Sequence, residues 1–156
     1  MIGCIQGAVR LGIAIMLGVV WGGVAIAQDV GLPAGTIQKP VDRQQWADAS
    51  HLSPGVRMLV LEGSPKAEGM FTIRLRIPAG TRLQPHWHPR DERVTILSGL
   101  AKVGFGDAWN EAAMTAFPAG SFYLNPPKSH HYVWIVEDTE MQLTGMGPWE
   151  VHFLEE

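Results

Sequence analysis

The sequence predicts an all-β fold, a sandwich or barrel built from many short strands. Residues 71–77 alternate between apolar side chains, at Phe71, Ile73, Leu75 and Ile77, and polar ones, as expected of a strand with one buried face. Similar short segments recur at close spacing along the chain, with glycine- and proline-containing turns between them. Few segments have a long helical pattern, so helices are expected to contribute little.

The expected strands follow one another with short connections. In chain order they cover residues 57–61, 71–77, 83–88, 93–97, 100–105, 121–125, 131–136, 140–145 and 149–153. Turn-forming residues separate them at 78–80, 98–99, 104–107, 118–120, 126–127, 137–138 and 145–148. A short helical turn is expected at 44–49, and residues 108–116 fit a helical or irregular insertion.

The length of 156 residues suits one domain preceded by a removable leader. We expect residues 1–27 to be a secretory signal peptide, because Arg10 precedes an uncharged, mostly apolar run that ends in small residues at Ala27. That run is marginal for a spanning helix, which needs about 20 apolar residues, so we expect no stable membrane anchor after cleavage. The mature protein is then periplasmic or secreted, with a linker and N-terminal arm at 28–55 and a barrel domain at 56–156.

Composition limits the chemistry of the mature protein. Cys4, the single cysteine, lies in the predicted leader, so neither a disulfide nor a thiolate ligand is expected. The formal charge is −3 for the full chain and −4 without Arg10, since one positive charge is lost. Lys and Arg are scattered rather than clustered, which argues against nucleic-acid binding.

A histidine-rich motif is the strongest functional signal. His86 and His88 are two residues apart, so in a strand they project from one face, about 6.6 Å apart at a rise of about 3.3 Å per residue. The turn that follows brings in Glu92 from the next expected strand, and His130 and His131 form a second cluster. Imidazole and carboxylate without sulfur suit Fe, Mn, Ni, Co or Zn, so we predict one divalent transition metal ion.

These residues resemble the two sequence motifs of the cupin family. The first motif is Gly, five residues, His-x-His, three or four residues, Glu, six residues and Gly, and it is matched by Gly80, His86, His88, Glu92 and Gly99. The second motif is matched at Gly120, Pro126 and His131, and the sequence departs from it at Lys128 and Ile135, where the family prefers Gly and Asn. The resemblance covers roughly residues 58–153.

The resemblance implies a double-stranded β-helix, the cupin jelly-roll barrel, with a metal ion held by His86, His88, Glu92 and His131. Motif spacing favours His131 as the fourth ligand, with His130 as the alternative. Cupins of this kind are often dimers, and exposed strand edges favour pairing, so we expect a homodimer.

Two classes of function compete. One is a metal-dependent, dioxygenase-like enzyme that oxygenates a small organic substrate, with Glu92 also able to accept a proton. The other is a non-catalytic periplasmic module that binds or senses a metal or small ligand, and a third reading is a metal that only stabilises the barrel. The sequence identifies no acid or base beyond the ligands, so catalytic residues stay unassigned.

Two expectations concern side chains near the motif. Gln84, two residues before His86, should share its face; it could support a metal ligand or contact a substrate, but plain packing or contact with solvent is favoured. The aromatic residues Trp134, Trp149 and Phe153 are expected to pack on the sheet rather than to line a ligand site.

Overall fold

The computed structural model describes residues 31–154, so the predicted signal peptide lies outside the described residues. By its internal contacts the chain divides into a unit of residues 1–36 and a second unit, Ile37–Glu156. In the first unit, the described residues form a turn in which the Thr36 amide donates to the Pro33 carbonyl at 3.1 Å. Within residues 31–154, the helices are too short or too polar to span a bilayer.

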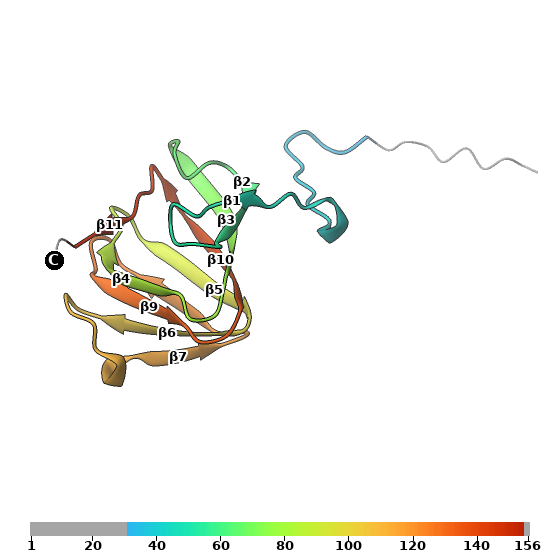
Figure 1. Cartoon of the computed structure of the whole chain (residues 1–156). Coiled ribbons are helices and arrows are strands. Elements are labelled where there is room, and N and C mark those ends of the chain that lie inside the picture. The colour runs from blue at the N-terminus through green and yellow to red at the C-terminus, as the bar shows by residue number, and fades with distance from the viewer. Residues whose placement is uncertain (1–30, 155–156) are drawn as a thin grey trace, which may run out of the picture. The chain divides into compact units, whose positions relative to one another are not determined.

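The second unit consists of two antiparallel sheets (Figure 1). The six-stranded sheet has the order β1 (Ala47–Asp48), β2 (Arg57–Glu62), β3 (Gly69–Ile77), β10 (Thr139–Gly147), β5 (Glu92–Ser98) and β8 (Phe122–Asn125). The five-stranded sheet has the order β11 (His152–Phe153), β4 (Arg82–Trp87), β9 (His131–Ile135), β6 (Leu100–Phe105) and β7 (Thr115–Pro118). Two 3₁₀ turns complete the described elements, η1 (Val41–Arg43) and η2 (Glu111–Ala113).

The chain crosses repeatedly between the two sheets. Strands β3, β5, β8 and β10 belong to the six-stranded sheet, while β4, β6, β7 and β9 belong to the other. Each crossing places consecutive strands in opposite layers, and Figure 1 shows β4, β9, β6 and β7 side by side in one of them. This is the predicted double-stranded β-helix, and the all-β fold class is confirmed.

The core lies between the inner faces of the sheets. The alternation in β3 is confirmed, because Phe71, Ile73, Leu75 and Ile77 are all buried, at 5% exposure or less. Strand β10 pairs with β3 along its whole length, from Thr139 opposite Ile77 to Gly147 opposite Gly69. The hydrophobic contacts of these strands hold the barrel in which the histidines lie.

One local expectation was wrong and two were only partly met. The predicted helical turn at 44–49 is replaced by strand β1, which the Arg57 guanidinium secures through hydrogen bonds to the Trp46 and Ala47 carbonyls at 2.6 and 3.2 Å. The expected helical or irregular insertion at 108–116 does contain η2, but strand β7 follows from Thr115 to Pro118 and has no alternation that would reveal it. Of the expected strand at 149–153, only β11 pairs as a strand.

Candidate metal centre

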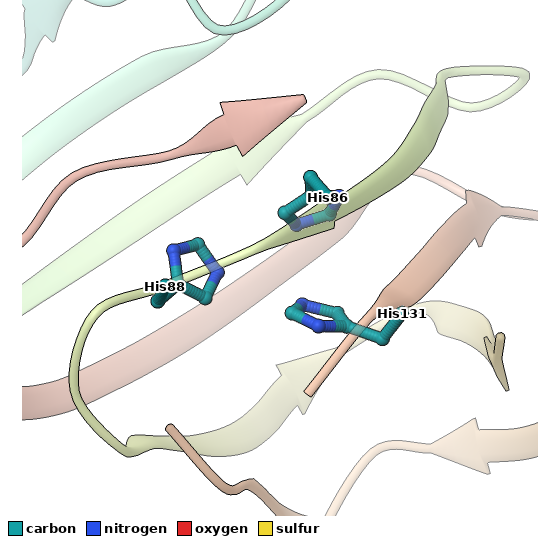
Figure 2. Close-up of side chains that lie close together, drawn as sticks. All are labelled: His86, His88 and His131. Carbon is teal, nitrogen blue, oxygen red and sulfur yellow. The ribbon is translucent and has the colours of Figure 1, made fainter. Parts of the chain in front are cut away.

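Three histidines meet inside the barrel. His86 lies near the end of β4, His88 directly follows that strand, and His131 begins β9, where it is paired with His86 in the strand register. Figure 2 shows the three rings facing one another from the two neighbouring segments. The ring centroids are 4.2 Å apart for His86 and His131, and 5.2 Å apart for each of the other two pairs.

The ligand atoms of this trio are close to the separation that one ion requires. One nitrogen from each of His86, His88 and His131 lies within 4.8 Å of the other two. Atoms bound about 2.1 Å from a shared ion lie roughly 3 to 4 Å apart. The predicted fourth ligand is adjacent, since Glu92 Oε2 is 3.5 Å from His88 Nε2 and 3.8 Å from His131 Nε2.

Backbone carbonyls fix the orientation of all three imidazoles. The Nδ1 atoms of His86, His88 and His131 lie 2.7, 2.8 and 3.0 Å from the carbonyl oxygens of Gln84, Glu150 and Ser129. A carbonyl oxygen can only accept, so each Nδ1 carries the proton and each neutral ring presents the Nε2 lone pair. This is how metal-binding histidines are usually oriented by their second hydrogen bond.

Burial keeps these imidazoles neutral. It lowers the pKa of His86 to about 3, with a further contribution from the neighbouring His131, and lowers the pKa of His88 to about 4. Burial also lowers the pKa of His131. Neutral imidazole is the form that binds metal, so at neutral pH the trio needs no deprotonation to do so.

Glu92, the predicted fourth ligand, places an ionisable carboxyl group in this interior. Glu92 is 6% exposed, and its burial raises the pKa of its carboxyl group. Asn125, opposite Glu92 in the β5–β8 register, donates from Nδ2 to Glu92 Oε2 at 2.8 Å. Asn125 was missed by the sequence reasoning; its signal is a polar residue two positions from Tyr123, on the inward face of an alternating strand.

The two neighbouring histidines of the second cluster lie apart. His131 is 1% exposed and belongs to the trio, whereas the His130 imidazole faces the Asp107 carboxylate at 2.7 Å on the surface. Val133 and Ile135 share the inward face with His131. The structure therefore brings His86, His88 and His131 together, places Glu92 beside His88 and His131, and leaves His130 out.

Gln84 does not share the face of His86, contrary to the expectation from spacing. The pairing of β4 with β9 shifts between Leu83 and His86, which marks a bulge. The irregularity places Leu83 and His86 in the lining of the same cavity and leaves the Gln84 side chain exposed. Gln84 contributes its carbonyl instead, as the acceptor for His86 Nδ1.

The histidines and Glu92 form part of the lining of a small, mostly apolar cavity of about 50 Å³. Its other walls are apolar side chains from both sheets and from the C-terminal segment, together with Tyr123. Burial, and secondarily the nearby Glu92 carboxylate, raises the pKa of Tyr123 well above its ordinary value, so the phenol stays protonated. The sequence did not predict Tyr123 in this lining. Trp149 and Phe153 were expected to pack on the sheet, but both line the cavity. Trp134 does not line it, and its ring contacts Arg82 and Lys102.

A double-stranded β-helix with histidines at the first-motif and second-motif positions defines a cupin. The model of the ChrR cupin-like domain family matches residues 36–150, and the chain belongs to that family. No curated protein shows significant sequence similarity to the chain.

Solved structures share the fold at low sequence identity. KdgF from Halomonas sp. is 17% identical with a TM-score of 0.54, over 69% of this chain and 91% of that one. An RmlC-like cupin from Shewanella frigidimarina is 13% identical with a TM-score of 0.56, over 69% and 87%. Salicylate 1,2-dioxygenase from Pseudoaminobacter salicylatoxidans, solved with gentisate, is 11% identical with a TM-score of 0.54, over 67% of this chain and 31% of that one.

Proposed function

We propose that this cupin binds one divalent transition metal ion through His86, His88, Glu92 and His131, and presents the ion to a small molecule in the barrel. Fe, Mn, Ni, Co and Zn all suit such nitrogen and oxygen ligands. Four protein ligands leave positions open on an octahedral ion, and a metal with open positions polarises an oxygen-bearing ligand or activates a bound water.

One observation carries the proposal: the Nε2 atoms of the three histidines are all hydrogen-bond acceptors, and they lie close together in the barrel interior. The three Nδ1 atoms are committed to backbone carbonyls, so the Nε2 lone pairs are left for the interior, and Glu92 Oε2 lies 3.5 Å from His88 Nε2. His88 Nε2 is buried and has no hydrogen-bond partner among the described residues. Leaving such a group unpaired is costly in a protein interior, and a cation satisfies all four groups at once.

The direct test is metal content by elemental analysis after loading. Wild-type protein should hold close to one ion per chain, and His86→Ala combined with His131→Ala should hold none, while His130→Ala should match wild type. Thermal unfolding of each metal-free variant checks that the fold survives. Undiminished metal in the double variant would refute the proposed ligand set.

For the chemistry, we propose a metal-dependent oxygenation of a small organic substrate. The salicylate dioxygenase shows that a barrel of this shape can host such a reaction, although the likeness extends to the fold alone. Oxygen consumption by protein loaded with Fe(II) or Mn(II), measured against catechols, flavonols and thiols, tests this. Turnover should vanish in Glu92→Ala and in the redox-inactive Zn(II) form.

A non-catalytic binding or sensing module is the second candidate, and the small cavity favours it. A volume of about 50 Å³ holds only a few atoms, far below the roughly 300 Å³ or more of a typical small-molecule pocket. Tight ligand binding without turnover under any metal would select this candidate. Loss of thermal stability on metal removal, without a binding defect, would instead select a purely structural metal.

We further propose that the protein is exported and dimeric. Export depends on the leader at residues 1–27, and the mass of the exported protein should correspond to a chain that starts at Gln28. Dimerisation through β8 has support in that strand, which lies at a sheet edge and carries the exposed side chains of Phe122 and Leu124. Light scattering should give twice the chain mass, and Phe122→Asp should return it to the monomer value.

A further inference from the structure

The C-terminal segment Trp149–Phe153 forms one wall of the cavity. Trp149, Val151 and Phe153 line it, whereas the intervening Glu150 and His152 do not. The alternation of an extended chain explains this pattern, because every second side chain faces the same way. Residues 149–153 thus supply three apolar side chains to the cavity that the proposed metal ligands also line.

The same segment contacts two of the proposed ligands directly. The Trp149 indole stacks on the His88 imidazole, with centroids 4.6 Å apart and ring planes at 20°. The Phe153 ring lies 5.4 Å from the His86 ring. Between them, the Glu150 carbonyl accepts the hydrogen bond from His88 Nδ1 at 2.8 Å.

The segment is held more firmly at Trp149 than at Phe153. The Trp149 amide donates to the Pro65 carbonyl at 2.7 Å, and the indole packs against Phe71 with ring centroids 5.8 Å apart. Nearer the C-terminal end, the His152 ring stacks on Trp87 with centroids 4.2 Å apart.

Strand β11 contributes two residue pairs to β4, at the edge of the five-stranded sheet, and the Leu154 amide adds one hydrogen bond to the Pro85 carbonyl at 3.0 Å. Phe153 is 47% exposed, which places it at the rim. The Trp149 Nε1 donor is buried without a partner among the described residues, a loss that rehydration would recover if the segment moved away.

We propose that Trp149 and Phe153 are specificity-determining residues, which close the metal cavity to all but ligands of a few atoms unless the segment 149–153 moves off β4. The inference rests on the proposed metal site and adds a size limit to it. With the segment in place, the cavity of about 50 Å³ has more room than one water molecule needs but less than a six-membered ring needs. If the segment moves to admit a larger molecule, the Glu150 carbonyl also moves away from His88 Nδ1. Access to the cavity is therefore linked to the orientation of the His88 ring, one of the proposed metal ligands.

The experiment compares a small and a large probe on the full-length protein loaded with Co(II), whose visible absorption reports ligand binding. The small probe is azide and the large probe is 4-nitrocatechol. The variants are wild type, Trp149→Ala with Phe153→Ala, and Trp134→Ala as the matched control, because Trp134 contacts Arg82 and Lys102 instead of the cavity.

The double variant should bind 4-nitrocatechol at least about tenfold faster than wild type, while azide association changes less than about twofold and Trp134→Ala matches wild type with both probes. Equal 4-nitrocatechol rates in wild type and the double variant would overturn the inference. So would an equal acceleration of azide, because the effect would then lie in the metal rather than in access. Elemental analysis of the same samples separates these results from a failure of the metal site, in which wild type would hold no Co(II).

Discussion

His130 and His131 are adjacent in the chain and lie in opposite environments. His131 is almost fully buried, donates to the Ser129 carbonyl and faces two other imidazoles. His130 is half-buried on the outside and faces the Asp107 carboxylate. The residue type is the same, so the difference comes from the alternation of side chains along β9 and from what each face meets. The outer histidine has a partner within the protein, whereas Nε2 of the inner His88 is buried with no hydrogen-bond partner in the described part of the chain.

The largest difference between His131 and His130 should appear in metal affinity when each is replaced. His131→Ala removes one of four proposed ligands, so the affinity for Co(II) should fall by about 100-fold or more, beyond the loss typical of residues that only support a ligand. His130→Ala should leave the affinity unchanged. Competition with a chromophoric chelator measures both, and an equal loss in the two variants would show that β9 presents the wrong face to the ion.

The buried histidines and the outer His130 should also differ in how they affect the acid sensitivity of the metal-free protein. The folded pKa values of about 3 for His86 and about 4 for His88 lie below the ordinary value of 6.5. As the pH falls below 6.5, these histidines bind protons in the unfolded chain but not yet in the folded protein. Their contribution to the free energy of unfolding is therefore full above pH 6.5 and decreases until the pH reaches about 3 to 4. The loss amounts to about 2 kcal/mol per histidine at pH 5.

Glu92 opposes part of this loss. Because burial raises its pKa, its contribution has the opposite sign, and protonation relieves a buried charge as the pH falls. Urea unfolding at pH 7 and pH 5 measures the sum. His86→Ala should flatten the pH dependence of the metal-free protein, while His130→Ala should keep it; stability that does not depend on pH in wild type would contradict the assignment of neutral buried imidazoles.

Much of this arrangement could be predicted from the sequence because it depends on local periodicity. The i,i+2 spacing of His86 and His88 is such a short-range pattern. The choice of His131 over His130 instead came from the spacing of the cupin motif, and the alternation of Val133 and Ile135 agrees with it. Strand β3 was predicted from local alternation, with its four apolar side chains on the buried face.

The rest depends on contacts between segments far apart in the chain. The bulge that turns Gln84 outward lies in the pairing of β4 with β9, and spacing alone cannot reveal it. The hydrogen bond from Asn125 to Glu92 and the stacking of Trp149 on His88 likewise join separate strands and segments. The ligand residues could therefore be proposed from sequence, but their supporting contacts and the cavity wall could not.

The turn that leads into His130 and His131 offers a smaller effect. Lys128 has a φ of 60°, a left-handed conformation that the departure from the family's Gly predicts to be strained. Its amide donates to the His88 carbonyl at 2.8 Å, a bond that glycine would keep. Lys128→Gly should therefore stabilise the protein by about 1 kcal/mol in urea unfolding. Ser129→Gly, where φ is not positive, should destabilise it instead, because glycine gives the unfolded chain more conformational freedom. A Lys128→Gly variant that is no more stable than wild type would contradict the strain at Lys128.

The smallest effect should come from the partner of the outer histidine. Asp107 is 81% exposed in its side chain, so its pairing with His130 is screened by water and salt. Asp107→Asn should change the free energy of unfolding by less than about 1 kcal/mol at low ionic strength, by less still at high salt, and should leave metal affinity unaltered. A fall in Co(II) affinity in this variant would mean that the outer pair holds β9 in the register that His131 requires, and the two histidines would then be coupled rather than independent.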